Sequence, residues 1–199
     1  MIKIGITGSI GCGKSYIAEK IKQLGIPVYD SDREAKRLMT SSIEIRTNLT
    51  NLLGTDAYIS DKQLNKRLIA DYLFASRENA KRINAVVHPA VKADFEIWAE
   101  KQRCPAVALE CAILYESGFN KLTDAVIAVS APKELCIKRA MARDRVTKEE
   151  IERRMAFQMT NQERCAQTPF VLLNDGSAHL DNRIAELLIR IKALKKKAF

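Results

Sequence analysis

The chain has 199 residues, of which 47% are hydrophobic, and this suits one globular domain with an ample apolar core. Its apolar stretches are much shorter than the roughly 20 residues that span a bilayer. The first residues also lack the long apolar run of a signal peptide. We therefore expect a cytoplasmic protein with no membrane partner.

The formal net charge of +9 suits either nucleic acid or a small, highly anionic substrate such as a nucleotide. No RNA-binding signature occurs, and aromatic residues are not interleaved with the basic ones, so we expect no nucleic-acid partner. The five cysteines are odd in number and form no C-x-x-C pair. This disfavours a disulfide scaffold or a zinc site and favours reduced thiols.

The N-terminal part predicts the start of an α/β fold. Residues 1–7 have the pattern of a buried strand, and residues 15–25 that of an amphipathic helix ended by glycine. Residues 26–30 form a second short strand pattern, and the glycine-rich stretch GSIGCGKS occupies 8–15. A strand–loop–helix–strand order is typical of a parallel sheet whose loop lies at the carboxyl edge, where such folds bind ligands.

From Ser31 to about Arg103 no pattern of a buried strand occurs, and successive helices are expected. These helices cover residues 33–40, 42–53, 61–75, 77–87 and 89–102. Pro89 fits the first turn of the last of them, because its missing N–H has no helical partner there. A helical insertion of this length between strands would build one wall of a cleft.

The C-terminal half returns to strands. Strands are expected at 105–110, 125–130 and 170–174, and helices at 133–145, 148–159 and 178–197. Between the first two of these strands, residues 111–124 form a loop at the same sheet edge. Together with the two N-terminal strands, they predict a five-stranded parallel sheet with helices on both faces.

The stretch 8–15 fits the phosphate-binding pattern G-x-x-x-x-G-K-[ST]. Its glycines let backbone N–H groups point at phosphate oxygens, next to the N-terminus of the following helix. Lys14 can reach the outer phosphates, and Ser15 can hold the Mg²⁺ that bridges them. The strand before the loop and the helix after it favour this interpretation over a plain turn. The predicted ATP-binding residues here are Gly11, Cys12, Gly13, Lys14, Ser15 and Tyr16, and Ser15 is the predicted metal ligand.

Cys12 occupies a variable position of this pattern. A thiol at a helix N-terminus can have a lowered pKa. Oxidants or alkylating agents would then inactivate the protein unless nucleotide shields Cys12. A small residue tolerated at this position is the alternative, and we favour it.

Two acids, Asp30 and Asp32, lie where the second strand ends. Either Ser31 or Asp32 could simply cap the helix that follows. An acid at this edge of the sheet could instead accept the proton of an attacking hydroxyl, and Asp30 could lie near the magnesium ion. The residues alone leave these alternatives open.

The polar residues that follow the fourth and fifth expected strands could either bind a ligand or form ordinary surface and turns. Arg139 and Arg143 are spaced to share one helical face, which could hold a migrating phosphoryl group or be an ordinary solvated surface. Asn174 and Gly176 follow the last expected strand, where they could meet an adenine ring or form a plain turn. Spacing does not decide the role of His88.

Among nucleotide-binding proteins, a GTPase switch is disfavoured. The chain has no D-x-x-G tetrad, and NKLTD at 120–124 is one residue too long for N-K-x-D and precedes a strand. A small-molecule P-loop kinase fits the length, the helical insertion and the basic segment after the fourth strand. The rivals are a nucleoside monophosphate kinase and a nucleotide-dependent module that binds RNA or protein.

Seven segments, in order along almost the whole chain, together resemble the dephospho-coenzyme A kinase family. They are IGITGSIGCGKS (its P-loop), VYDSDREAKRL (its V-x-D-A-D motif), INAVVHPAV (its H-P segment), LECAILYESG (its D-x-P-L-L-F-E segment), and KRAMARD, RRMAFQ and LLNDGS (its Arg-x-x-x-Arg lid, R-x-x-x-Q element and terminal N-x-G). Each motif is modest alone, but their order and spacing are specific.

The resemblance implies transfer of the ATP γ-phosphate to the ribose 3′-hydroxyl of dephospho-CoA, the last step of coenzyme A biosynthesis. It implies Asp32 as the base, assisted by Lys14 and Arg139. The further implied ligands are Arg143, Asn174 and Gly176 for ATP, and Asp32, Lys66, His88 and Glu116 for the acceptor. Mg²⁺ is the implied cofactor, and a monomer or weak homo-oligomer is expected.

The implied organisation is a single P-loop kinase domain of three parts. The core covers about 1–30, 104–138 and 166–199, the helical acceptor-binding insertion about 31–103, and the helical lid about 139–165. The chain departs from the family pattern in the acceptor region. Ala112 stands in place of Pro, Tyr115 in place of Phe, and Asn65 and Lys66 in place of an acid and an arginine. Lysine is a poorer bidentate phosphate ligand than arginine.

Overall fold

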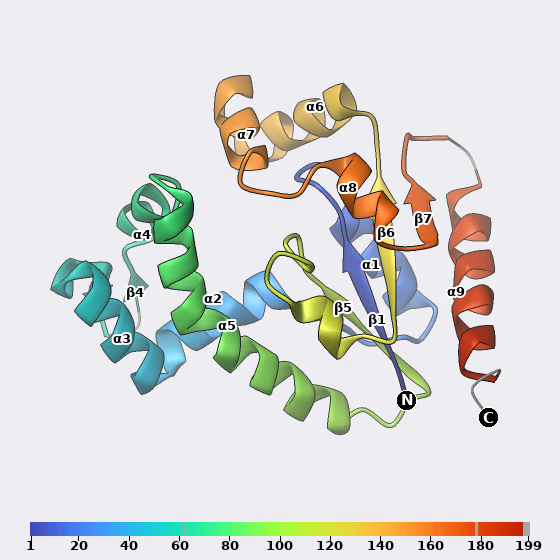
Figure 1. The fold of residues 1–199 in the computed structure, drawn as a ribbon, viewed down its shortest axis with the longest axis horizontal. Helices are drawn as coiled ribbons and strands as arrows, with labels where there is room; N and C mark the ends of the chain where they lie inside the picture. The colour runs from blue at the N-terminus through green and yellow to red at the C-terminus, as the bar shows by residue number, and fades with distance from the viewer. Residues whose placement is uncertain (62, 178, 197–199) are drawn as a thin grey trace. The chain divides into compact units, whose positions relative to one another are not determined.

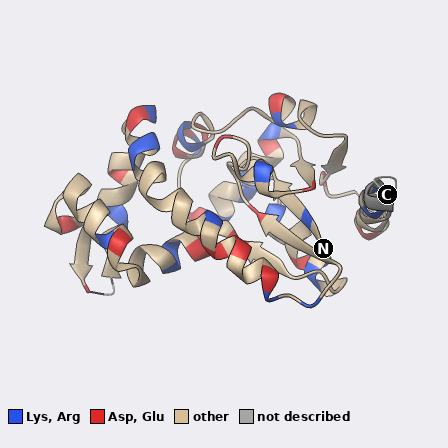
Figure 2. Cartoon of the chain, turned by 60° about the horizontal axis from the view of Figure 1, so that its bottom comes forward, with Lys and Arg blue, Asp and Glu red and all other residues tan. Residues whose placement is uncertain are grey.

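The computed structural model describes residues 1–61, 63–177 and 179–196 (Figure 1). By its contacts the chain divides into two compact units, Met1–Tyr29 with Lys101–Phe199, and Asp30–Glu100. Charged residues are spread over the helices of both units, whereas the strands of the large sheet are mostly uncharged (Figure 2). This is the pattern of parallel strands buried on both faces. None of the helices in these described ranges is long and apolar enough to cross a membrane.

The first unit is built on a five-stranded sheet. Its strands are β1 (Ile2–Thr7), β2 (Val28–Asp30), β5 (Ala106–Glu110), β6 (Ala125–Ser130) and β7 (Phe170–Leu173), in the order β2-β5-β1-β6-β7. The central strand β1 runs parallel to β5 and β6, and β6 runs parallel to β7. The five strands predicted from the sequence are therefore confirmed. Because parallel strands end at the same edge, this edge gathers the residues that follow each strand.

Helices pack on the sheet because every second residue of β1 places an apolar side chain on the same face. Ile2, Ile4 and Ile6 are buried in the main core with apolar residues of α1 (Lys14–Gln23) and α9 (Leu180–Lys196). Figure 1 shows α1 behind the sheet and α8 (Asn161–Ala166) in front of it, where α8 contacts β6. The predicted α/β architecture is thereby confirmed. Residues 178 and 197 of the predicted last helix lie outside the described residues.

Three helices lie between β6 and β7. They are α6 (Lys133–Asp144), α7 (Lys148–Met155) and α8, and the 3₁₀ helix η2 (Phe119–Leu122) lies before β6. The sequence predicted α6 and α7 but not α8, since its six residues, four of them polar, show no apolar periodicity. Its signal was a capping box, in which Thr160 and Glu163 satisfy each other's backbone N–H groups.

The second unit is mainly helical. Its elements are α2 (Ser31–Ser41), α3 (Ile43–Leu53), η1 (Thr55–Ala57), β3 (Tyr58–Ser60), β4 (Gln63–Leu64), α4 (Lys66–Leu73) and α5 (Arg77–Glu100). Helix α5 contacts α2, α3 and α4. Two details of this unit differ from the sequence predictions.

The first difference is a small antiparallel hairpin, β3–β4, where the sequence predicted no strand and a helix from Asp61. The hairpin is held by a residue distant in sequence. Arg46 bonds Asp61 Oδ1 at 2.8 Å through Nη2 and lies 4.7 Å above the ring of Tyr58. The helix begins only at Lys66, because the Asn65 side chain accepts a hydrogen bond from Leu68 N at 3.2 Å and caps it.

The second difference concerns Pro89, which we expected in the first turn of a separate helix. It lies inside α5, a continuous helix of 24 residues. The buried residues of α5 keep a four-residue spacing across the proline, and they are Ile83, Val87, Val91, Phe95 and Ala99. Pro89 itself is exposed. Packing of one uninterrupted apolar face thus outweighs the hydrogen bond that proline removes.

Candidate active site

The glycine-rich loop connects β1 to α1 and needs glycine for conformation and for packing. Gly13 is the N-cap of α1 with φ of 92°, and Gly11 has φ of 77°. Both values are costly for residues with a Cβ. A Cβ on Gly11 would also lie 2.0 Å from the carbonyl oxygen of Cys136 in α6. The loop is therefore pressed against the first turns of α6.

The loop forms a cavity of about 220 Å³ at the N-terminus of α1. Its lining residues are Gly11, Gly13, Lys14, Ser15, Tyr16, Arg139 and Arg143. Within the loop, Lys14 Nζ donates to the carbonyl oxygen of Ser9 at 3.2 Å. The structure thus brings the predicted loop residues together with the two predicted arginines, across more than a hundred residues of sequence.

Ser15 has a carboxylate partner that sequence reasoning missed. Its hydroxyl donates to Glu110 Oε1 at 2.7 Å. Glu110 is the last residue of β5, which pairs with β1. The sequence feature that could have indicated this partner is the acid that ends the otherwise apolar strand β5. A hydroxyl and a carboxylate side by side offer oxygen ligands of the kind that Mg²⁺ prefers.

The two arginines of α6 have different partners. Arg139 Nη1 donates to the carbonyl oxygen of Asn174 at 2.9 Å. Arg143 bonds both carboxylate oxygens of Asp144, at 2.7 and 3.0 Å. This pairing raises the pKa of Arg143 and lowers that of Asp144, whose second partner is Arg154 at 3.5 Å. Both arginines line the cavity, but each is already oriented by a neighbour.

Asn174 follows β7 and is buried. Its Nδ2 donates to the carbonyl oxygen of Cys12 at 2.9 Å, so the side-chain amide is directed at the loop. Gly176 has φ of 91°, and a Cβ there would lie 4.0 Å from Arg139 Nη2. The proximity of Asn174 and Gly176 to adenine stays a prediction.

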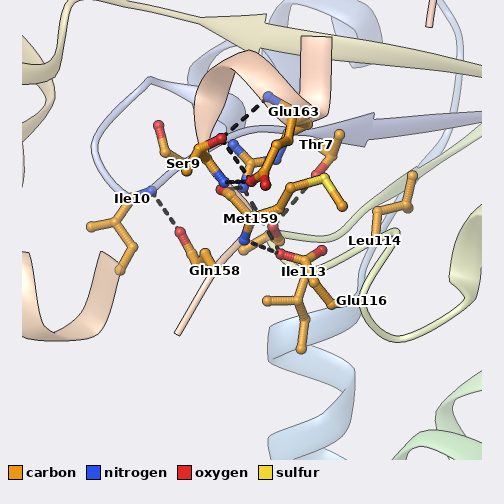
Figure 3. A network of polar contacts seen from close by, with 12 residues as sticks. Thr7, Ser9, Ile10, Ile113, Leu114, Glu116, Gln158, Met159 and Glu163 are labelled. Atoms are coloured by element: carbon orange, nitrogen blue, oxygen red, sulfur yellow. Dashed lines mark hydrogen bonds and ion pairs between the residues drawn. The ribbon is translucent and has the colours of Figure 1, made fainter. Parts of the chain in front are cut away.

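Glu116 was predicted to bind the acceptor, and the structure gives it protein partners. Its Oε1 accepts from Met159 N at 2.6 Å (Figure 3). The same oxygen lies 4.0 Å from Arg164 Nη2. Arg164 is fully buried, and in the described part of the chain its Nε and Nη1 have no hydrogen-bond partner. Sequence reasoning did not single out this buried cation. The sequence feature that could have pointed to it is an arginine within the short stretch that forms α8.

A second contact ties the same segment to the loop. Figure 3 shows Gln158 directed at Ile10, and Gln158 Oε1 accepts from Ile10 N at 3.2 Å. Gln158 and Met159 lie between α7 and α8. The segment after α7 is therefore joined both to the glycine-rich loop and to the turn after β5.

Cys12 is fully buried, and burial raises the pKa of its thiol even though Lys14 acts in the opposite direction. A raised pKa leaves less thiolate at a given pH. We expect iodoacetamide at pH 8 to alkylate the partly exposed Cys104 and Cys165 well before Cys12. Mass spectrometry of timed digests measures this order, and equally fast labelling of Cys12 would restore the interpretation as a reactive thiol.

The predicted acids lie at the start of the second unit. Asp30 Oδ1 accepts hydrogen bonds from Asp32 N and Arg33 N, both at 3.0 Å. Asp30 is therefore the N-cap of α2, so the alternative in which Ser31 or Asp32 caps this helix is wrong. Asp30 fits because it is the last strand residue, still in extended conformation. Asp32 lies in the first turn of α2 with its side chain exposed.

The other predicted acceptor ligands in this unit are Lys66 and His88. Lys66 is the exposed first residue of α4. His88 lies in α5, where burial and the charge of Lys92 lower its pKa to about 4. At neutral pH His88 is uncharged, so it can exchange hydrogen bonds with a ligand but offers no positive charge. The roles of both residues stay predictions.

Comparison with known proteins identifies the family. The family model described as dephospho-CoA kinase matches residues 2–179. This chain belongs to the dephospho-CoA kinase family. A dephospho-CoA kinase of Bacteroides fragilis is 42% identical over 188 residues, which are 94% of this chain and 91% of the relative. The predicted family, the dephospho-CoA kinase function and the class of enzyme, a kinase that transfers phosphate to an alcohol group, are thereby confirmed.

Solved structures agree on the fold of this dephospho-CoA kinase family member. A protein of Thermus thermophilus superposes with a TM-score of 0.83 and 32% identity, covering 95% of this chain and 96% of that one. A shikimate kinase from Acinetobacter baumannii shares the fold with a TM-score of 0.57 and 15% identity, covering 98% and 95%. The P-loop kinase fold predicted from the sequence is confirmed. Membership of the family also implies a nucleotide substrate.

Proposed function

We propose that this protein transfers the γ-phosphate of ATP to the ribose 3′-hydroxyl of dephospho-CoA, with ATP bound at the loop of residues 8–15. The observation that carries the proposal is the cavity in which Gly13, Lys14, Ser15 and Arg139 meet. Backbone N–H groups at a helix N-terminus, an ammonium group and a guanidinium group together match a polyphosphate chain. The excess of basic residues suits two polyanionic substrates.

Each side chain of the cavity has a proposed role. Lys14 would leave the carbonyl of Ser9 and neutralise the outer phosphates. Arg139 and Arg143 would stabilise the negative charge that spreads over the phosphoryl group during transfer. Glu116 is proposed to act by holding the segment after α7, since its carboxylate already accepts from Met159 N.

Mg²⁺ is the proposed cofactor, held by Ser15 with Glu110 nearby. The hydroxyl and carboxylate lie 2.7 Å apart and supply hard oxygen ligands, so the residues present fit this ion. When bound, the ion neutralises charge on the β- and γ-phosphates. Glu110 orients the Ser15 hydroxyl, which leaves a lone pair of the serine oxygen for the metal.

Removing the hydroxyl of Ser15 tests this site. We expect Ser15→Ala to raise the Mg²⁺ concentration for half-maximal activity by about tenfold or more, because one oxygen ligand is lost. Ser15→Thr keeps the hydroxyl and should stay within about threefold of the original protein, since the loop pattern accepts either residue. Titration of Mg²⁺ at a fixed ATP concentration measures the half-maximal Mg²⁺ concentration of both variants. An equal requirement in all three proteins would exclude Ser15 as a ligand.

We assign acceptor binding to the second unit, Asp30–Glu100. Asp32 is the proposed base toward the 3′-hydroxyl, because it lies exposed in the first turn of α2, just after the end of β2, as the family motif places it. Lys66 would contact phosphate groups of the acceptor. His88, uncharged at neutral pH, would contribute a hydrogen bond.

The segment of about 139–165 is the proposed lid. Its contact with the loop through Gln158 and Ile10 would bring basic side chains over the phosphates. A closed lid excludes water and so suppresses hydrolysis of ATP. A cytoplasmic location and a monomeric or weakly associated state belong to the same proposal.

An acceptor panel distinguishes this function from its rivals. A coupled assay for ADP should show turnover with dephospho-CoA and little with adenylate or other nucleoside monophosphates. Phosphorylation of adenylate but not of dephospho-CoA would overturn the proposal in favour of a nucleoside monophosphate kinase. ATP turnover that depends on added RNA would favour a nucleic-acid-dependent module.

A further inference from the structure

Asn174 connects three parts of the first unit at the carboxyl edge of the sheet. Its backbone N–H donates to Ser130 O at 2.8 Å, and its backbone carbonyl accepts from Arg139 Nη1 at 2.9 Å. The residue is only 7% exposed, and its side chain donates through Nδ2 to Cys12 O at 2.9 Å. The backbone contacts hold Asn174 in place, and the side chain alone reaches the loop.

The side-chain contact fixes one peptide group of the loop. The Cys12 carbonyl and the Gly13 N–H belong to the same planar trans peptide, so they point in opposite directions. Holding the carbonyl toward Asn174 therefore turns the Gly13 N–H away from it. A peptide free to rotate would present this N–H in many directions.

The packing of Gly13 shows that the contact is close. A Cβ on Gly13 would lie 2.1 Å from Asn174 Nδ2, so the amide lies directly against the glycine. Gly13 also has φ of 92° and lines the 220 Å³ cavity with Lys14 and Ser15. In loops of this pattern, backbone N–H groups cradle the α- and β-phosphates.

We propose that Asn174 is a positioning residue for the phosphate-binding loop: it holds the Cys12 carbonyl and thereby aims the Gly13 N–H at the β-phosphate. Asn174 then acts on any polyphosphate, whatever base it carries. This differs from the sequence prediction that Asn174 lies near adenine. The inference rests on the proposed binding of ATP at this loop.

The variant Asn174→Leu keeps the branched shape and both backbone contacts but removes the donor. Calorimetric titration of the full chain with inorganic tripolyphosphate and, separately, with ADP tests the role. We expect both dissociation constants to rise by about tenfold or more, because a hydrogen bond to a charged phosphate is weakened. Thermal unfolding measured in parallel separates this effect from loss of stability, which alone would leave the affinities of the folded protein unchanged.

Thr168→Val is the matched control. Thr168 is also buried, and its Oγ1 donates to Val126 O at 2.5 Å just before β7, so this variant loses a side-chain-to-carbonyl hydrogen bond that does not reach the loop. Its two affinities should stay within about twofold of the original protein. If Asn174→Leu does not fold, Asn174→Ser supports the same comparison, because its shorter side chain cannot span the distance to Cys12 O.

Two results would overturn the inference. A weaker affinity for ADP with an unchanged affinity for tripolyphosphate would mean that Asn174 contacts the base. Unchanged affinity for both ligands would mean that the contact has no role in binding. Failure of the proposed function is seen separately, in the original protein, as an absence of dephospho-CoA phosphorylation.

Discussion

Replacing Asp32 by asparagine is expected to lower the turnover number by about 10²–10⁴, the usual contribution of a general base. The amide keeps the size of the side chain but cannot accept the proton of the attacking hydroxyl. The Michaelis constant for ATP should change little, because the phosphate-binding loop belongs to the first unit. Steady-state kinetics with dephospho-CoA and ATP measures both quantities.

Asp30→Asn is the matched control for this prediction. Asp30 accepts hydrogen bonds from Asp32 N and Arg33 N at the start of α2. Asparagine is as good a helix cap as aspartate, so α2 should keep its stability and the turnover number should stay within a few-fold. A turnover number unchanged in Asp32→Asn, or lowered as strongly in Asp30→Asn, would remove Asp32 from its proposed role.

Lys14→Met should have the second largest effect, a loss of about 10²–10³ in turnover number. Methionine is similar in length but carries no charge. The ammonium group lies 3.2 Å from Ser9 O, within the loop, and we propose that it moves only a short way to the outer phosphates. The negative charge on these phosphates grows during transfer. Loss of the ammonium group should therefore lower the turnover number more than the affinity for ATP.

Lys20→Met provides the corresponding control on the same helix. Lys20 pairs with Asp181 at 3.1 Å on the surface between α1 and α9. Exposed ion pairs contribute little, so activity should stay within about twofold. If Lys14→Met retained normal turnover while Lys20→Met did not, the phosphate site proposed at the loop would be wrong.

Features governed by neighbouring residues were predictable. The strand, glycine loop and helix over residues 1–25 follow from periodicity and from glycine conformation, which act over a few positions. The same holds for the five strands and for α6. The order of the motifs was also enough to indicate the family. His88 and Glu116 were selected as acceptor ligands by that resemblance, but their electrostatic and hydrogen-bond states became visible only in the structure.

The sequence by itself determined the fold class, the glycine-rich loop between β1 and α1, and the family, because these depend on local patterns of residues. Only the tertiary structure decided which side chains complete the site. Ser15 meets Glu110 across 95 residues, and Cys12 meets Asn174 across 162. Such pairs arise because parallel strands carry distant segments to one sheet edge, so no local preference signals them. The helix that continues through Pro89 has the same kind of cause, since packing of its buried face outweighed the local effect of proline.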